Sequence, residues 1–231
     1  MERTVLRLLV AVAAFSLAWV FLPASSLCRA RAIIVRPHPH LPETAEWALP
    51  GHLRAKGYLP CGALNRAVHY LRTHRSEFPN RRYLTIIDYT EPSTSKRLFL
   101  IDLDTGTVTR LLVSHGKNSG KLYATRFSNR PDSFESPRGF FLTGPEYYGP
   151  HGPSMVLYGL QKGVNDNSFS RKIVMHGAYY VSRGAIRLNR RLHGLARLGL
   201  SEGCPAIPMR EAQVVISKIK DGSLLYVYAG R

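Results

Sequence analysis

Apolar residues change their spacing near residue 80, and the change separates one helical segment from a longer β-rich part. Between Gly62 and Phe78 the apolar positions recur at i, i+3, i+4 and i+7, the spacing of a helix that buries one face. Pro79-Asn80 follows and ends the pattern. The apolar positions are Leu64, Ala67, Val68 and Leu71.

From Tyr83 onward the chain consists of short runs rich in β-branched and aromatic residues, separated by Gly, Pro, Asn and Asp. Runs of this kind predict β-strands. Asp104-Thr105-Gly106 lies between two of them and predicts a hairpin turn. The predicted strands are Tyr83–Tyr89, Lys96–Leu103, Thr107–His115, Gly139–Thr143, Met155–Leu160, Lys172–His176 and Ser223–Tyr228.

One segment of the β-rich part has helical spacing. Met209–Ile219 places Ala212, Val215, Ile216 and Ile219 on one face, so a second amphipathic helix is expected there. The prediction is a mostly β domain, sandwich or barrel-like, with one helix before it and one near its end. His115–Pro137 and Arg183–Ser201 are too long for hairpin turns, and we expect them to be functional loops.

The first 60 residues differ in composition from the rest. Arg3 and Arg7 precede an uncharged apolar run from Leu8 to Leu22, the layout of a signal peptide. The run is also long enough to serve as an uncut membrane anchor, so residues 1–32 are read as one or the other. Five prolines make residues 33–60 a connector, and residues 61–231 form the predicted domain. We therefore expect an exported protein of the periplasm or cell envelope.

The net charge of the chain limits the kinds of partner that it is expected to bind. Lys and Arg number 32 against 15 Asp and Glu, a formal net charge of +17. A charge of this size favours a polyanionic neighbour, which could be nucleic acid, anionic lipid or an anionic cell wall. Because export makes nucleic acid an unsuitable partner, we expect the anionic cell envelope, with lipid or nucleic acid binding as the weaker alternative.

Several kinds of site are missing from the sequence. The nine histidines form neither His-Glu-x-x-His nor His-x-x-Glu-His, and no Cys-x-x-Cys is present, so no metal site is predicted. No glycine-rich phosphate loop and no Gly-x-Ser-x-Gly nucleophile turn occurs. We expect no cofactor, and the remaining candidate nucleophile is a thiol.

Cys204 and His176 are the residues best placed for thiol chemistry. Cys204 follows Gly203, whose conformational freedom allows a tight turn that presents backbone N–H groups to an oxyanion. His176 ends an apolar strand and could accept the thiol proton, oriented by the carbonyl of Gly177. Two structural alternatives stay open: His176 as an ordinary strand-end histidine, and Cys204 paired with Cys61 or simply buried.

Two segments around these residues resemble the L,D-transpeptidase (YkuD-type) family, in particular its murein L,D-transpeptidase catalytic domain branch. They are Met175-His176-Gly177-Ala178 and Ser201-x-Gly203-Cys204-Pro205-Ala206, and the similarity covers roughly residues 60 to 230. The resemblance implies a mostly β fold and peptidoglycan stem peptides as substrate. It also implies that Cys204 is the nucleophile, His176 its proton acceptor, Gly177 an orienting carbonyl, Gly203 and Cys204 oxyanion donors, and Ser201 the small hydroxyl residue of the motif.

The chain departs from the wider family at two positions. Glu202 stands where a second histidine is usual, and Ala206 stands where Asn or Arg is usual, so substrate contacts at these positions do not transfer. The segment between His176 and Cys204 is also longer than usual and rich in arginine. These arginines form either a solvated face or a platform for carboxylates.

The expected reaction is acyl transfer through a thioester between Cys204 and a tetrapeptide stem, with an amine as acceptor. Two alternatives remain: an L,D-carboxypeptidase that uses water as acceptor, and an inactive wall-binding module in which Cys204 is bridged to Cys61. The sequence does not fix the acceptor, the third stem residue or the oligomeric state.

Overall fold

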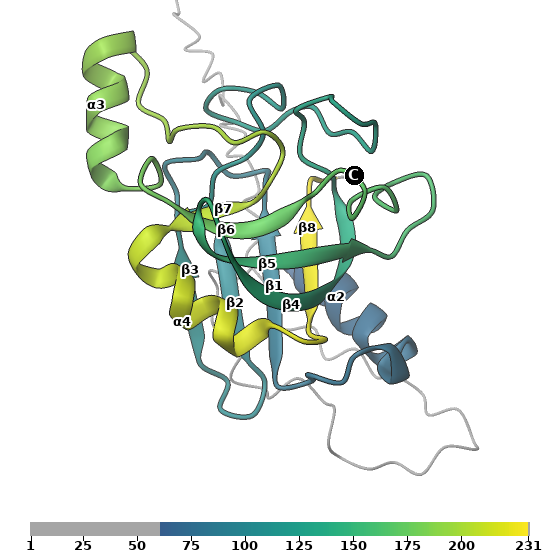
Figure 1. The fold of residues 1–231 in the computed structure, drawn as a ribbon. Coiled ribbons are helices and arrows are strands. Elements are labelled where there is room, and N and C mark those ends of the chain that lie inside the picture. Colours follow the sequence, from purple (N-terminus) through teal and green to yellow (C-terminus); the bar gives the residue numbers. More distant parts are fainter. Residues whose placement is uncertain (1–60, 231) are drawn as a thin grey trace, which may run out of the picture.

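The computed structural model describes residues 61–230. One sheet of eight strands dominates this part of the chain, in the order β3-β2-β1-β8-β4-β5-β6-β7 (Figure 1). The β1–β8 and β6–β7 pairs are parallel and the other pairs are antiparallel. In chain order the elements are α2 (Cys61–Thr73), the 3-10 turn η2 (Arg75–Glu77), β1 (Tyr83–Asp88), β2 (Leu98–Asp102), β3 (Val108–Leu111), β4 (Gly139–Gly149), β5 (Gly152–Gly159), β6 (Val174–Ala178), α3 (Arg183–His193), β7 (Ala206–Pro208), α4 (Met209–Ile219) and β8 (Leu224–Tyr228).

The sheet bends until its first and last strands meet. Ser114, three residues after β3, donates its N–H to the carbonyl of Ala206 in β7 at 2.8 Å. Gly116 and Ser201 form a further parallel bridge beyond that bond. The sheet is therefore a near-barrel, as the mostly β prediction requires.

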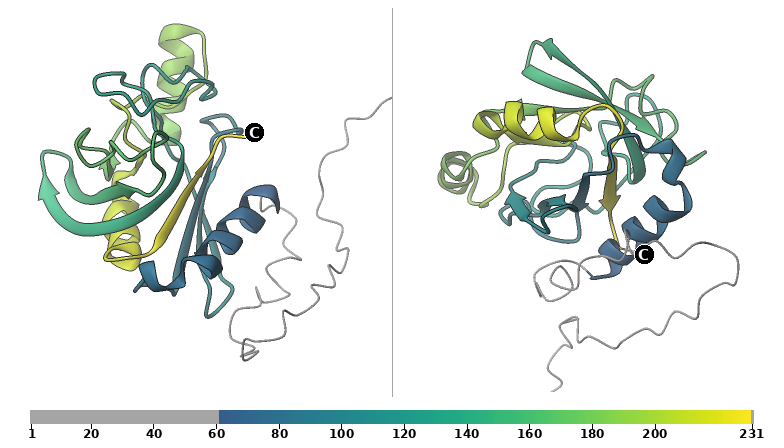
Figure 2. Two further views of the ribbon diagram at one scale, coloured as in Figure 1. Left: turned by 90° about the vertical axis from the view of Figure 1, so that its right-hand side faces the viewer. Right: turned by 90° about the horizontal axis from the view of Figure 1, so that it is seen from below.

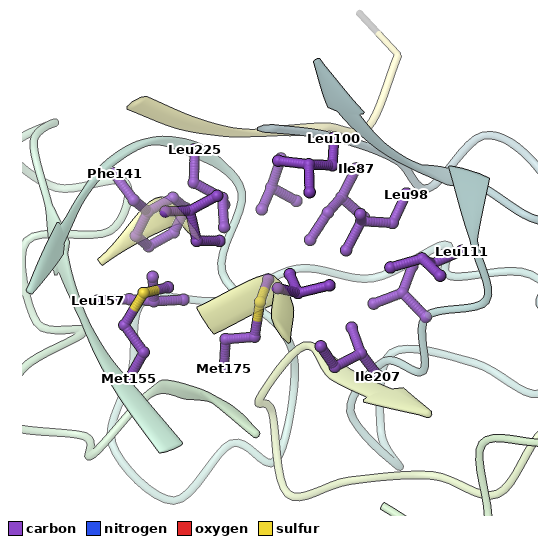
Figure 3. Packing of buried hydrophobic residues seen from close by; sticks show 14 of the residues in the cluster. Ile87, Leu98, Leu100, Leu111, Phe141, Met155, Leu157, Met175, Ile207 and Leu225 are labelled. Atoms are coloured by element: carbon purple, nitrogen blue, oxygen red, sulfur yellow. The ribbon is translucent and has the colours of Figure 1, made fainter. Parts of the chain in front are cut away.

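The interior of the near-barrel is apolar. Alternate residues of the strands point inward and pack against α4, whose buried face consists of the four residues predicted from its spacing. Figure 3 shows this packing, with the sulfur atoms of Met155 and Met175 between aliphatic side chains. The other labelled residues are Ile87, Leu98, Leu100, Leu111, Phe141, Leu157, Ile207 and Leu225.

The other face of β1, β2 and β8 is covered by α2. Leu84 and Ile86 of β1 point toward α2, whereas Ile87 points into the near-barrel, because successive side chains of a strand alternate between faces. Figure 2 shows α2 and α4 on opposite sides of these strands. The amphipathic helix predicted between Gly62 and Phe78 ends at Thr73, and the 3-10 turn η2 leads from there to Phe78.

All seven predicted strands are present, although several of their ends differ; β5 begins at Gly152 and β6 runs from Val174 to Ala178. The strand predicted at Thr107–His115 is regular only over Val108–Leu111. The strand predicted to end at Thr143 continues to Gly149. Pro145 lies at a register shift between Thr143 and Glu146, where the missing N–H of proline costs no ladder bond.

One predicted loop is wrong, because Arg183–His193 forms the helix α3. The Ser182 hydroxyl accepts the Ala185 N–H at 3.0 Å at its start, and Gly194 has a left-handed backbone at its end. Ala185, Leu188 and Leu192 recur at i, i+3 and i+7, a helical spacing that the loop prediction overlooked. None of the helix residues is buried, and Ile186 packs only partly against the cluster that contains Val181 and Leu198. The helix projects from the body in Figure 1. The short strand β7, which contains Pro208, was also not predicted.

The predicted export segment and the proline-rich connector, residues 1–32 and 33–60, lie outside the described residues. Among the helices of residues 61–230, none has the length and apolar character needed to cross a membrane.

Candidate active site

His176 lies in the middle of β6, which continues to Ala178, so it does not end the strand as predicted. It is almost completely buried, with 3% of its surface exposed. Its Nδ1 is 2.9 Å from the carbonyl oxygen of Gly177. Because a carbonyl only accepts hydrogen bonds, Nδ1 carries the proton and donates it, and Nε2 of the neutral ring keeps its lone pair. The expected orienting contact between Gly177 and His176 is therefore present.

Cys204 lies in the turn before β7, beside the start of β6. The register of these parallel strands pairs His176 with Ala206, so Cys204 lies two positions before the partner of His176. Its Sγ is 3.5 Å from the N of Val174 and 3.7 Å from the O of Lys172. The thiol is half-buried and free. The side chain of Cys61, the partner considered for a disulfide, lies outside the described residues.

The electrostatic environment keeps both groups neutral at rest. Burial raises the pKa of the Cys204 thiol, and the Val174 N–H and the Arg171 guanidinium offset only part of the increase. Burial lowers the pKa of His176, and its bond to Gly177 opposes that change. A neutral thiol beside a neutral imidazole suits proton transfer at the moment of attack rather than a resting ion pair.

Ser201 holds the turn that carries Cys204. Its hydroxyl donates to the carbonyl of Cys204 at 2.6 Å and accepts the N–H of Gly203 at 3.2 Å. The Gly203 N–H, one of the two expected oxyanion donors, is therefore bonded within the turn. The Cys204 N–H has no acceptor among the described residues, so it is the donor left for an oxyanion.

A buried serine supports the turn from behind. The hydroxyl of Ser136 donates to the carbonyl of Gly203 at 2.9 Å and accepts the N–H of Gly116 at 2.9 Å. Gly203 has a φ of +126°, and a side chain there would lie 3.0 Å from the carbonyl oxygen of Glu135. Only glycine fits this backbone without strain, which explains why glycine precedes the cysteine.

Arg171 also supports the site and is not paired with Asp166. Its guanidinium donates to the carbonyls of Ser128 and Glu135, and its charge acts on the Cys204 thiol. Asp166 instead accepts hydrogen bonds from the Asn129 side chain and the Gly163 N–H. The role of Arg171 could not be recognised from the sequence, because its partners, the carbonyls of Ser128 and Glu135 and the hydroxyl of Ser133, belong to a distant loop.

The two positions that depart from the wider family make no hydrogen bond to Cys204, although burial and, to a smaller extent, the Glu202 charge raise the pKa of the Cys204 thiol. Glu202 is exposed and pairs with Lys117 at 3.0 Å. Ala206 is completely buried in β7. Neither side chain offers a donor beside Cys204, in agreement with the expectation that family contacts at these positions do not transfer.

His151 was not singled out in the sequence, yet its ring lies against His176. It comes from the turn between β4 and β5, and the two ring centroids are 4.5 Å apart with an interplanar angle of 27°. The residues next to His151 in the sequence, Pro150 and Gly152, do not predict this contact. The pairing of the strands in the sheet brings the two histidines together.

His115 lies in the interior, at the start of segment 115–137. It is completely buried, and its Nδ1 is 2.7 Å from a guanidinium nitrogen of Arg97. Burial and the neighbouring Arg97 lower the pKa of His115 to about 4. It is a neutral structural histidine. Within residues 61–230, no cluster of His, Cys, Asp and Glu could hold a metal ion.

The comparison with protein families agrees with this geometry. The family model described as "L,D-transpeptidase catalytic domain" matches residues 56–228, most of the chain. The chain belongs to this family. A search of curated proteins finds no match.

Solved L,D-transpeptidases are distant relatives in sequence. A Mycobacterium smegmatis L,D-transpeptidase is 14% identical, with 64% of this chain and 59% of that chain covered and a TM-score of 0.37. An L,D-transpeptidase from Xylanimonas cellulosilytica is 15% identical, with 77% and 68% covered and a TM-score of 0.36. The helical cell shape determining protein Pgp2 of Campylobacter jejuni is 15% identical, with 75% and 58% covered and a TM-score of 0.38. The chain thus spans about three fifths of the first of these structures.

Proposed function

We propose that this L,D-transpeptidase domain forms a thioester between Cys204 and a tetrapeptide stem of peptidoglycan and transfers the acyl group to an amine. The observation that carries the proposal is the bond from His176 Nδ1 to the Gly177 carbonyl. It leaves Nε2 as a base on the strand beside the thiol. The family match supports a substrate drawn from peptidoglycan.

The acylation step follows from this arrangement. His176 Nε2 takes the thiol proton as the sulfur forms a bond to the carbonyl carbon of the third stem residue. The Cys204 N–H stabilises the oxyanion, and the bond to the terminal D-alanine breaks. His176 returns its proton to the departing amine, and the thioester remains.

The second half of the reaction reverses the roles. His176 takes a proton from the attacking amine of a second stem, which forms a C–N bond as the C–S bond breaks. The proton returns to the thiolate and a cross-linked product leaves. Water in place of the amine gives the carboxypeptidase outcome with the same residues.

The chemistry of the substrate agrees with the proposed location. Stem peptides and the anionic envelope polymers around them would attract a chain of net charge +17. We place the enzyme in the periplasm or cell envelope, to which the predicted export segment would deliver it.

Mass spectrometry of the intact full-length protein tests the proposal. The protein is incubated with disaccharide tetrapeptide, and Cys204→Ala is the matched control. We expect an acyl adduct on the wild type alone, together with cross-linked dimer. Tripeptide without dimer would indicate the carboxypeptidase. Neither adduct nor product, whether Cys204 is free or bridged to Cys61, would favour a wall-binding module; comparison with and without reductant tells the two states of the thiol apart.

A further inference from the structure

The turn between β4 and β5 places a second imidazole directly on His176. The rings of His151 and His176 are stacked, with 4.5 Å between centroids. His151 is exposed, whereas His176 is buried. The outer ring therefore covers part of the inner one on the solvent side.

The backbone around His151 fixes this placement. Gly149 pairs with Gly152 in the β4–β5 hairpin, and Ser154 pairs with His176 of β6. His151 therefore lies at the hairpin tip, three residues from the register partner of His176. Gly152 has a φ of +71°, a left-handed backbone that lets the chain turn back immediately after the histidine.

Burial is the main cause of the lowered pKa of His176, and His151 is the neighbouring ionisable side chain that lowers it further. The strand neighbours of His176 are Ser154 on β5 and Ala206 on β7, both uncharged. The Cys204 thiol beside its strand is held neutral by burial. The charged residues of α4, which packs against β6, do not act on the titration of His176. A protonated His151 disfavours a second positive charge 4.5 Å away and thereby lowers the pKa of His176.

We propose that His151 is a positioning residue of the active site, which holds the His176 ring by stacking and favours its neutral, proton-accepting form. This inference rests on the proposed function, since it assigns His176 the role of base. His151 also places a second histidine at the site. In the motif of this chain, Glu202 occupies the position where a second histidine is usual in the family.

Two substitutions separate stacking from charge. His151→Ala removes both, and His151→Phe keeps an aromatic ring without a charge. We expect the acylation rate of the full-length protein to fall about tenfold in His151→Ala, because the base is less well held, and to stay near wild type in His151→Phe. His193→Ala, at an exposed histidine of α3, is the matched control and should change nothing.

The pH profile provides the second measurement. Acylation requires neutral His176, so its rate falls on the acid side. Without the His151 charge the pKa of His176 rises, and this acid limb should move to higher pH in both His151 variants. The titration of His176, followed by NMR of the full-length protein with 15N-labelled histidine, should move in the same direction.

Two results would overturn the inference. One is a His151→Ala variant with unchanged rate and unchanged His176 titration. The other is a His151→Phe variant as slow as His151→Ala with an unchanged titration, which would point to a substrate contact. If no stem peptide acylates the wild type, the proposed function fails, but the NMR titration still decides whether His151 and His176 are coupled.

Discussion

The two segments expected to be functional loops, 115–137 and 183–201, differ in how they relate to the rest of the molecule. The first has almost no regular structure but is tied to the Cys204 turn by buried hydrogen bonds. The hydroxyl of Ser136 donates to the carbonyl of Gly203 at 2.9 Å and accepts the N–H of Gly116 at 2.9 Å. The N–H of Lys117 also bonds to the carbonyl of Ser201, where the second segment ends, at 2.7 Å. The second contains a regular helix, α3, with no buried residue.

The difference shows that a segment can have regular secondary structure without being packed against the rest of the domain, and can be irregular yet bound to it by buried hydrogen bonds. A helix satisfies its backbone internally and can project into solvent. An irregular segment that is buried must find a partner for each polar group, and here the partners belong to the active-site turn. Substitutions behind the Cys204 turn should therefore cost much more stability than substitutions in α3.

The largest effect is expected at Arg97, which is completely buried beneath segment 115–137. Its guanidinium donates to the carbonyls of Val113 and Glu91 and contacts His115. Arg97→Met leaves these groups without a partner, and we expect the free energy of unfolding to fall by about 3 to 4 kcal/mol.

Urea denaturation measures this loss. Arg82→Met is the control, because Arg82 is exposed in its pair with Asp102 and should cost at most about 1 kcal/mol. Equal losses in the two variants would contradict the special role of the buried arginine.

The pH dependence of stability should also report on this region. The pKa of His115 is about 4 in the folded protein, below its ordinary value, so the unfolded chain binds more protons between the two values. Stability from neutral His115 is therefore complete above about pH 6.5 and is lost as pH falls toward 4, on the order of 3 kcal/mol in all.

Measurements of the free energy of unfolding at several pH values check this pH dependence, which His115→Gln should reduce. His176, whose pKa is also lowered, contributes in the same direction. A slope that is the same in His115→Gln and wild type would show that other groups cause the acid sensitivity.

A smaller effect is expected at Ser136, which joins segment 115–137 to Gly203. Ser136→Ala leaves the Gly116 N–H and the Gly203 carbonyl without their partner. We expect a loss of about 1 to 3 kcal/mol, together with slower acylation because the Cys204 turn is less well held. Denaturation and the acylation assay measure the two effects.

Ser170→Ala is the matched control for Ser136, because the Ser170 hydroxyl bonds to the carbonyl of Asn167 at an exposed site. We expect it to change stability by less than about 0.5 kcal/mol. A Ser136→Ala variant with the stability and activity of Ser170→Ala would mean that the link to Gly203 contributes little.

The smallest effect is expected in α3. Replacing Arg187, Arg190 and Arg191 together with alanine removes exposed charges, none of which pairs with an acidic side chain in the part of the chain that the structure describes. We expect a change in unfolding free energy below about 1 kcal/mol. A larger loss in thermal or urea unfolding would mean that α3 is attached to the body as firmly as segment 115–137.

Most of the fold could be predicted from local patterns. Met209–Ile219 is the helix its spacing indicated, since that spacing records the face buried against the sheet. The same rule was not applied to α3, although Ala185, Leu188 and Leu192 follow helical spacing; the many arginines between them favoured a loop, and the structure leaves this face unburied. Ser182 and Gly194 were nevertheless available as signals of its two ends.

The candidate site could be predicted only in part. Cys204, Gly203 and Ser201 belong to one turn and were recognised together with His176 and Gly177. Arg171 and His151 were missed as members of the site. Their contacts connect residues from separate elements, and neither has a neighbour in the sequence that would reveal them.

The sequence by itself determined the strands, the helices with a buried face and the residues able to carry out thiol chemistry, because each depends on the composition and spacing of adjacent residues. The tertiary structure decided which of these meet. The parallel pairing of β6 and β7 brings His176 alongside the Cys204 turn across 28 positions, and the β4–β5 hairpin places His151 on His176. Such contacts follow from the closure of the whole sheet, in which many weak interactions are satisfied together, and no local segment contains that information.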